Sequence, residues 1–403
     1  MTLELERLTP QIVEMAQAIA QQRTASGELL DEFEALLETY ATDWERIERA
    51  LETAAAQADQ KHYRSAKPLA SDESPLNAQI AAGNCPSEAI IVATDGSQIM
   101  PDRHAAYLYY VINIGGVVYY HGNGRSPQQF TWPTLRFPDD DEETNFVTSS
   151  GEVSIQRDLQ EIGHLADLAW ENRSENCPVL AVLDQRLLYW PVGSTDSALN
   201  EDTQKWLKAM DKLHDSNALL AGYIDRPMTS AVLTLLRAIQ GLDDPQFDWK
   251  SLGKRPANGG LTDAALFRRL LGPGERSRVF VMVSPVNEQF AHYQATHEVC
   301  FFYMNPGTVG QQIARVDIPR WVAEDAQAVT AVHNLIYTQC QLLGTYPYII
   351  ARADEMAVIR HEEHRQLDQL IDNIMQRHNV SGSLTGKQTG KNLARGDKRR
   401  FGL

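Results

Sequence analysis

The sequence predicts an α/β fold with a mixed sheet, and the order of its apolar patterns is the reason. Three β-rich runs follow one another between residues 90 and 122. Helical patterns and apolar runs then alternate from residue 153 onward, and helical patterns occupy the end. Consecutive strands pair antiparallel, whereas strands separated by a helix can pair parallel. We therefore expect a sheet of both kinds of pairing with helices packed on it.

Composition limits the class of protein. The 403 residues are 43% hydrophobic, which is enough to form a core in one large domain with appendages or in two domains. No run of 18 apolar residues occurs, and the start, "MTLELERLTPQIVEM", lacks the basic and apolar regions of a secretion signal. Cys85, Cys177, Cys300 and Cys340 form no CxxC pair, which argues against a zinc site or a disulfide framework. We expect a reduced, cytoplasmic protein without a membrane segment.

The N-terminal part predicts a helical extension over residues 1–66 and a linker over 67–87. From residue 28 to about 55, apolar residues recur at spacings of three and four, as in a coiled-coil seam. This helix either packs on its own domain or contacts a second subunit. The stretch 65–88 is rich in Ser, Pro, Ala and Asn, which is typical of a loop. The seam residues are Leu30, Phe33, Leu37, Tyr40, Trp44, Ile47 and Leu51.

A main domain is expected over residues 88–378. The first strand covers 90–95, and "AAYLYYVINIGGVVYYHG" (105–122) contains two runs joined by Gly115-Gly116, a hairpin signal. Residues 124–145 indicate a polar loop whose acidic run, 139–143, lies on a solvated surface. We expect further strands at 177–184, 217–225, 278–284, 299–305 and 313–319, and helices at 153–172, 202–214, 229–239, 323–342 and 353–378.

The charge distribution is uneven along the chain. The formal net charge is -16, which is not typical of a nucleic-acid-binding protein, although a groove needs only local positive potential. The tail over residues 379–403 differs, because its last 23 residues carry six Lys or Arg and one Asp. Without apolar periodicity it is expected to be disordered. It either keeps the protein soluble or binds phosphates without sequence preference.

Carboxylates follow two of the apolar runs. Asp95 and Asp184 each end such a run, and active sites of open α/β sheets lie beyond the carboxyl ends of strands. Two-metal phosphoryl chemistry needs several carboxylates, and magnesium and manganese prefer oxygen ligands. Each Asp could instead form a turn or cap a helix. If Asp95 is a metal ligand at the tip of its strand, Gly96 lets the chain turn away from the metal.

Two later acids extend this set. The helix at 153–172 offers Glu161 or Asp158 near its apolar face, and a solvated position is the alternative for either. Asp354 lies near the expected start of the last helix, where it could be an N-cap. Other chemistries fit less well, since GxSxG, GxxxxGK[ST], GxGxxG and HExxH motifs are missing from the sequence. His297-Glu298 is interpreted as structural.

In this order the motifs resemble the NurA nuclease domain, over roughly residues 88–362. The Asp-Gly-Ser that follows the first apolar run is the most specific element. The Tyr-Pro pair with a polar residue eight positions later comes next. The stretches that carry the resemblance are "IIVATDGSQI", "AAYLYYVINIGGVVYYHG", the helix with Glu161, "VLAVLD", "ALLAGYIDRPMTSAVLTLLR" and "GTYPYIIARADEMAVI".

The resemblance implies a ribonuclease H-like core that binds manganese, with magnesium as the alternative. It implies a 5′-3′ exonuclease and endonuclease on single-stranded DNA in double-strand break end processing. It also implies a homodimer that works with a HerA-type hexameric ATPase. Carried over by motif, the metal ligands would be Asp95, Glu161, Asp184 and Asp354, the last at a position where relatives can carry His. Arg226 and the basic tail would hold the DNA backbone, and Tyr346 or Trp190 would stack on bases.

The sequence also departs from the family pattern. Gln185-Arg186 replaces a frequent Gly-Ser turn, and Asp225 stands where relatives often have Lys. Asp225 is either an extra ligand or a helix cap. These changes keep two other hypotheses open. One is a catalytically weak scaffold that regulates the ATPase, and the other is a metal-dependent enzyme acting on RNA or a small phosphate.

Overall fold

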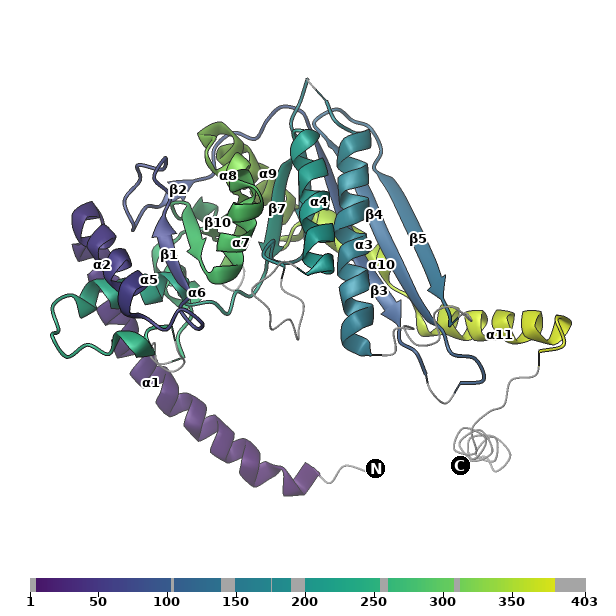
Figure 1. The fold of residues 1–403 in the computed structure, drawn as a ribbon, viewed down its shortest axis with the longest axis horizontal. Coiled ribbons are helices and arrows are strands. Elements are labelled where there is room, and N and C mark those ends of the chain that lie inside the picture. Colours follow the sequence, from purple (N-terminus) through teal and green to yellow (C-terminus); the bar gives the residue numbers. More distant parts are fainter. Residues whose placement is uncertain are drawn as a thin grey trace. The chain divides into compact units, whose positions relative to one another are not determined.

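The computed structural model describes residues 5–102, 105–138, 149–174, 176–189, 200–253, 260–307 and 312–380 (Figure 1). By its internal contacts the chain divides into two compact units. The first unit comprises Met1–Pro86, Asp184–Leu188 and Leu219–Tyr348, and the second comprises Ser87–Leu183, Tyr189–Ala218 and Ile349–Leu403. Each unit is formed by segments that are distant in the sequence, so neither is a continuous stretch of chain.

The first unit contains a sheet in the order β1-β9-β10-β11-β7. Its paired strands run antiparallel, and β8 pairs with both β10 and β2. The strands are β1 (Ser65–Pro68), β2 (Ile80–Ala81), β7 (Leu219–Ile224), β8 (Glu275–Arg276), β9 (Phe280–Val283), β10 (Val299–Met304) and β11 (Ala314–Pro319). The helices are α1 (Thr9–Thr39), α2 (Trp44–Gln57), α5 (Ala231–Gly241), α6 (Asp263–Leu270), α7 (Pro285–Tyr293), α8 (Arg320–Ala323) and α9 (Ala326–Leu343), with short 3-10 turns at Leu5–Arg7, Trp249–Ser251 and Ala295–His297.

The N-terminal seam is two helices and not one. The helix is interrupted between α1 and α2, where the side chain of Asp43 accepts a hydrogen bond from the backbone N–H of Arg46 and caps α2. Phe33, Leu37 and Ile47 are buried in the hydrophobic core of the first unit. The seam therefore packs on its own domain, which is the first of the two alternatives given for this helix.

The expected loop at 65–88 contains two short strands. β1 pairs with β9, and β2 pairs with β8. Leu69 and Leu76 are buried beside them. Strands of four and two residues are too short to show the alternation by which a strand is recognised in a sequence. The loop interpretation is wrong at these places.

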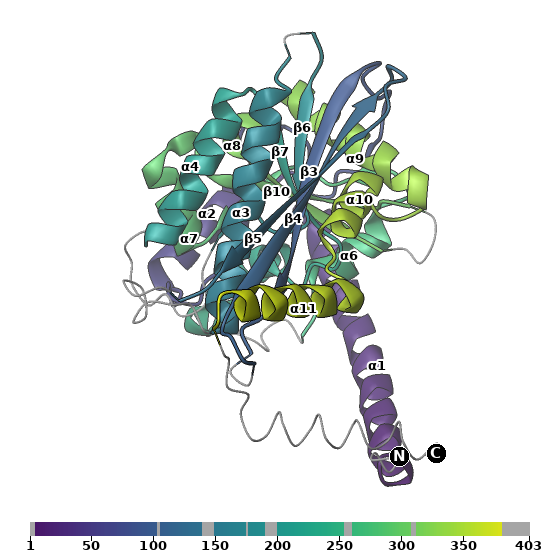
Figure 2. The same cartoon turned by 90° about the vertical axis from the view of Figure 1, so that its right-hand side faces the viewer.

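The second unit contains the mixed sheet that the sequence predicts. Its order is β6-β3-β4-β5, in which β6 runs parallel to β3 and the other pairs are antiparallel. The strands are β3 (Ala89–Ile99), β4 (Tyr110–His121), β5 (Gln128–Arg136) and β6 (Val179–Leu183), and the helices are α3 (Ser150–Glu171), α4 (Glu201–Asp215), α10 (Tyr348–Ala357) and α11 (His361–Arg377). Helix α3 packs along β3, β4 and β6, and α10 lies on the opposite face of β3 and β4 (Figure 2).

The hairpin predicted at Gly115-Gly116 is wrong. Both glycines lie inside β4, and the third strand of the meander is β5, within the expected loop. A Cβ atom on Gly115 would lie 2.4 Å from the backbone nitrogen of Ala357 in α10, and one on Gly116 would lie 2.5 Å from the ring of Trp132. Glycines in a strand often mark such a close approach, which is their role here. The acidic run at 139–143 lies outside the described residues.

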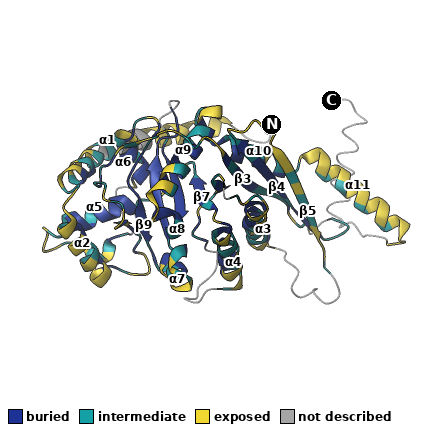
Figure 3. Cartoon of the chain, turned by 90° about the horizontal axis from the view of Figure 1, so that it is seen from above, coloured by how far each residue is buried: buried dark blue, intermediate teal, exposed yellow. Residues whose placement is uncertain are grey.

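The last helical pattern also divides into two helices. Residues 358–360 separate α10 from α11, so Asp354 lies inside α10 and is not an N-cap. No residue of α11, which is described along its whole length, is buried (Figure 3). In the part of the chain that the structure describes, no helix is long and apolar enough to cross a membrane. All four cysteines are described, and each is a free thiol. Residues 381–403 of the basic tail lie outside the described residues.

Candidate active site

Asp95 lies inside β3 and not at its tip. It pairs with Gly115 of β4, and β3 continues to Ile99. The parallel pairing of β3 with β6 ends at Thr94 and Leu183. Asp95 is therefore the first residue of β3 beyond that pairing. The strand-end prediction holds for the parallel pair, whereas the strand itself extends further along β4.

Gly96 does not form the turn that we expected. It is paired within the β3–β4 ladder, and its backbone N–H donates a 2.8 Å hydrogen bond to Oδ1 of Asp95. A Cβ atom at this position would lie 2.5 Å from Oε1 of Glu161 and 2.6 Å from Cγ of Arg157. The absence of a side chain therefore allows the polar side chains of α3 to approach the strand.

Asp95 and Asp354 form a pair of neighbouring carboxyls. Successive side chains of a strand point to opposite faces, and Ser97, two residues after Asp95, donates a hydrogen bond to the backbone oxygen of Ala357 in α10. The pKa of Asp95 is raised to about 6, first by burial and then by the charge of Asp354 and a hydrogen bond with it. The Gly96 N–H and the charge of Arg157 act in the opposite direction. The two acids therefore favour sharing a proton or a cation.

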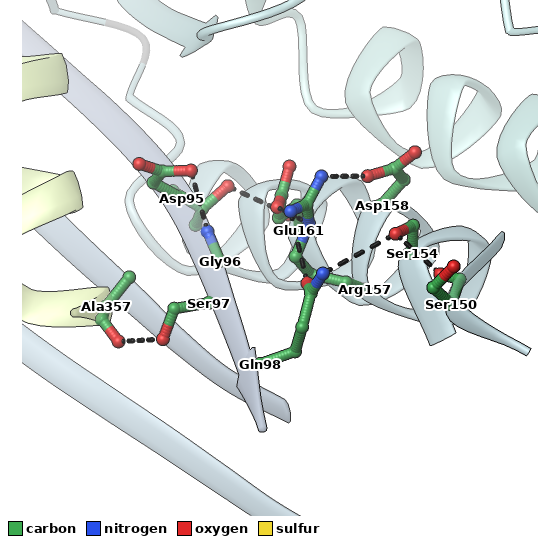
Figure 4. Close-up of polar contacts among 11 residues, drawn as sticks. Asp95, Gly96, Ser97, Gln98, Ser150, Ser154, Arg157, Asp158, Glu161 and Ala357 are labelled. Carbon is green, nitrogen blue, oxygen red and sulfur yellow. Dashed lines mark hydrogen bonds and ion pairs between the residues drawn. The ribbon is translucent and has the colours of Figure 1, made fainter. Parts of the chain in front are cut away.

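The acids of α3 are held by Arg157 (Figure 4). Its Nε lies 3.0 Å from Oε1 of Glu161, and its Nη2 lies 2.9 Å from Oδ1 of Asp158. Its Nη1 donates a 3.1 Å hydrogen bond to Oε1 of Gln98 in β3. Glu161 is 5% exposed, and its backbone oxygen accepts a hydrogen bond from the hydroxyl of Thr94. Sequence reasoning overlooked Arg157, although its spacing of four residues from Glu161 is a signal for an ion pair on a helix.

The other predicted site residues belong to the first unit. Asp184 follows Leu183 directly and is exposed. Asp225 and Arg226 follow β7, and the side chain of Arg226 is 80% exposed. Burial raises the pKa of Asp225. Tyr346 contacts the ring of Tyr223 edge-on, with 5.6 Å between centroids. Their roles stay predictions, and Trp190 lies outside the described residues.

The His297-Glu298 pair fits its structural interpretation. His297 is buried, and its ring lies 5.2 Å from that of Trp321, measured between centroids. Glu298 forms an ion pair with Arg320. The two side chains thus contact different partners within the first unit.

The donor set fits a divalent cation in part. Asp95 and Asp354 supply hard oxygen atoms and repel each other, which a cation would relieve. Glu161 contacts Arg157 instead, so it would have to exchange the guanidinium for a metal. Among the described residues, no three or more His, Cys, Asp or Glu side chains are grouped so that they could hold a metal ion. The two carboxylates are thus the part of the site that is already assembled.

The second unit contains an antiparallel meander, followed by a helix and then by a strand parallel to the first. Its candidate acids lie on β3, α3 and α10. This arrangement defines an α/β protein with a mixed sheet flanked by helices. The NurA domain profile matches residues 89–359, which is more than half of the chain. The chain belongs to the NurA family, and this membership supports a nuclease.

The solved structures that match this chain include the following three, each of which is a similarity alone. The NurA nuclease from Sulfolobus solfataricus is 10% identical, with a TM-score of 0.46, and the match covers 85% of this chain and 97% of that one. The catalytic domain of human endonuclease V is 11% identical, with a TM-score of 0.33 and coverage of 83% and 96%. LC9-RNase H1 is 10% identical, with a TM-score of 0.21 and coverage of 35% and 64%. None of the curated proteins matches this chain.

Proposed function

We propose that this protein is a metal-dependent DNA nuclease that hydrolyses phosphodiester bonds in single-stranded DNA. It would act as a 5′-3′ exonuclease and as an endonuclease in the processing of double-strand breaks. The observation that carries the proposal is the pair formed by Asp95 and Asp354 where β3 extends beyond β6. Membership of the NurA family supports it. Mn²⁺ is the proposed ion, and Mg²⁺ is the alternative.

The chain's own residues would hold the ion and position the substrate. Asp95 and Asp354 would provide the first oxygen ligands, with Asp184 and Glu161 as further ones. A divalent cation bound there supplies an activated water and charge stabilisation for the leaving 3′ oxygen. Gly96 keeps the surface of β3 open to the side chains of α3, so that acids from two elements can approach the strand.

The remaining partners are part of the same proposal. The exposed Arg226 and the basic tail would contact phosphates, and such contacts carry no sequence information. Tyr346 would stack on a base. A homodimer and a HerA-like hexameric ATPase follow from the family resemblance. A cytoplasmic location follows from the four separated cysteines, which form no CxxC pair. The proposed nuclease domain covers residues 88–378.

A catalytically weak scaffold that regulates such an ATPase is the second candidate. One observation favours it, because Arg157 contacts the acid of α3 that the nuclease would need as a ligand. Gln185-Arg186 in place of a Gly-Ser turn points the same way.

The two candidates differ in DNA cleavage by the purified protein. End-labelled single-stranded DNA, double-stranded DNA and RNA would be incubated with Mn²⁺, Mg²⁺ or a chelator. We expect metal-dependent cleavage of single-stranded DNA that falls at least about 100-fold in Asp95→Asn, because a ligand should matter at least as much as the groups that orient it. The matched control is Asp167→Asn, which changes an exposed acid of α3 paired with Lys212. Absence of cleavage by folded wild type would favour the scaffold, and cleavage of RNA alone would favour a different phosphodiesterase.

A further inference from the structure

Arg157 lies across β3 and binds Glu161, which the proposed metal site would use, and its neighbour Asp158. Three of its nitrogen atoms contact three different side chains, those of Glu161, Asp158 and Gln98 (Figure 4). Its charge also acts on Asp95. Only 31% of the Arg157 side chain is exposed, so this is a packed arrangement and not a surface ion pair.

The strand provides the space for this arrangement. A Cβ atom on Gly96 would meet Cγ and Cδ of Arg157 at 2.6 and 3.0 Å, and Oε1 of Glu161 at 2.5 Å. Any other residue at position 96 would push the Arg157–Glu161 pair away from β3. Gln98, on the same face of the strand, accepts a hydrogen bond from the far end of the guanidinium. Gly96 and Gln98 of β3 thus accommodate an arginine at position 157 of α3.

A guanidinium and a divalent cation require the same carboxylate oxygens. The Glu161 carboxylate is already paired at 3.0 Å with Nε of Arg157. Two positive groups next to one carboxylate repel each other, and the repulsion is stronger where water is partly excluded. A metal that gains Glu161 as a ligand must therefore displace Arg157 or bind against its charge.

We propose that Arg157 is an internal counter-ion that competes with the divalent metal for Glu161 and Asp158. This inference rests on the proposed metal-dependent function of the same site. Arg157 neutralises the acids of α3 when metal is absent, and it sets the concentration at which metal binds. It is a positioning residue, since it acts through Glu161.

The test is calorimetric titration of Mn²⁺ alone into the full-length protein without DNA. We expect Arg157→Gln to bind Mn²⁺ at least about tenfold more tightly than wild type, because a competing positive charge has been removed. Gln98→Ala removes the acceptor of Nη1, together with a 3.5 Å hydrogen bond from Gln98 to Ser154, and should tighten binding less, in the same direction. Arg173→Gln is the matched control, because its guanidinium lies 4.3 Å from the ring centroid of Trp170, over that ring, and should not change Mn²⁺ affinity. Circular dichroism verifies that each variant is folded.

The outcomes separate this inference from the proposed function. Unchanged or weaker Mn²⁺ binding by folded Arg157→Gln and Gln98→Ala, with wild type binding metal and cutting DNA, would overturn the competition alone. Arg157 would then hold Glu161 in place for the metal. If neither wild type nor the variants bind Mn²⁺ or Mg²⁺, both the proposed function and this inference fail. Binding that appears only in Arg157→Gln would support the competition strongly.

Discussion

Asp95 in the second unit and Asp263 in the first unit have pKa values that are both raised to about 6, chiefly by burial. Their neighbours differ completely. Asp263 accepts hydrogen bonds from the backbone N–H groups of Val232 and Leu233 and from the hydroxyl of Tyr303. Asp95 accepts one from Gly96 and lies beside a second carboxyl.

The role of Asp263 follows from these donors. Ser230, at the N-terminus of α5, makes no capping bond with its side chain, and Asp263 binds two N–H groups of that first turn instead. A raised pKa alone therefore does not mark a reactive site. An acid that is surrounded by donors supports the fold, whereas one placed against another acid needs a proton or a cation.

The largest expected effect is the loss of stability in Asp263→Ala. The substitution leaves the N–H groups of Val232 and Leu233 without their acceptor, at about 1–3 kcal/mol for each group that stays unsatisfied, and it removes one of the two partners of the Tyr303 hydroxyl. We expect the free energy of unfolding to fall by about 4 kcal/mol, measured by urea denaturation at pH 7. Asp248→Ala, at an exposed 3-10 turn, is the control and should lose about 1 kcal/mol. Equal losses in Asp263→Ala and Asp248→Ala would contradict the fold-supporting role of Asp263, on which its contrast with Asp95 depends.

The second effect is a pH dependence of stability caused by Asp263. Its pKa is about 6 in the folded protein and ordinarily 3.8, so the folded state holds the proton more tightly. The free energy of unfolding therefore falls as the pH rises between about 4 and 6, by up to about 3 kcal/mol from this group. Denaturation curves at several pH values should show a weaker fall in Asp263→Asn than in wild type. A parallel pH profile in the two proteins would contradict this assignment.

The smallest effect is a gain of stability in Asp95→Asn. The amide removes a partly buried charge and its repulsion from Asp354 while it keeps an acceptor for the Gly96 N–H. We expect a gain of about 1 kcal/mol at pH 8 with chelator, after discounting the pKa shift for partial exposure. Thermal unfolding of wild type and variant would measure it. Destabilisation would mean that Asp95, like Asp263, supports the fold.

The sequence predicts elements well where the pattern is local. The helices expected at 153–172 and 202–214 are α3 (Ser150–Glu171) and α4 (Glu201–Asp215), because each buries one clear apolar face. The strands β6 and β10 appear as continuous apolar runs because they are buried on both faces. β5 was missed because it is largely exposed and contains Pro133, both typical of an edge strand.

The features of the candidate site also divide into those that follow from a local pattern and those that depend on packing. Asp95 is found from its position after an apolar run, which is local information. Its pairing with Asp354 is not local, since the two acids are brought together by the packing of α10 on β3 and β4. The contacts of Arg157 with β3 depend on the missing side chain of Gly96, and a lone glycine after an aspartate equally predicts a turn.

The glycines of this sheet differ in how evolution could replace them. At Gly96 and Gly116 the obstructing atoms belong to side chains, including those of Glu161 and Trp132. A second substitution could shorten those neighbours, so changes at these positions can be compensated. At Gly115 the obstruction is the backbone of α10, which no exchange of side chains removes. Position 115 is therefore a fixed point of the fold, whereas positions 96 and 116 are free to vary together with the residues that they face.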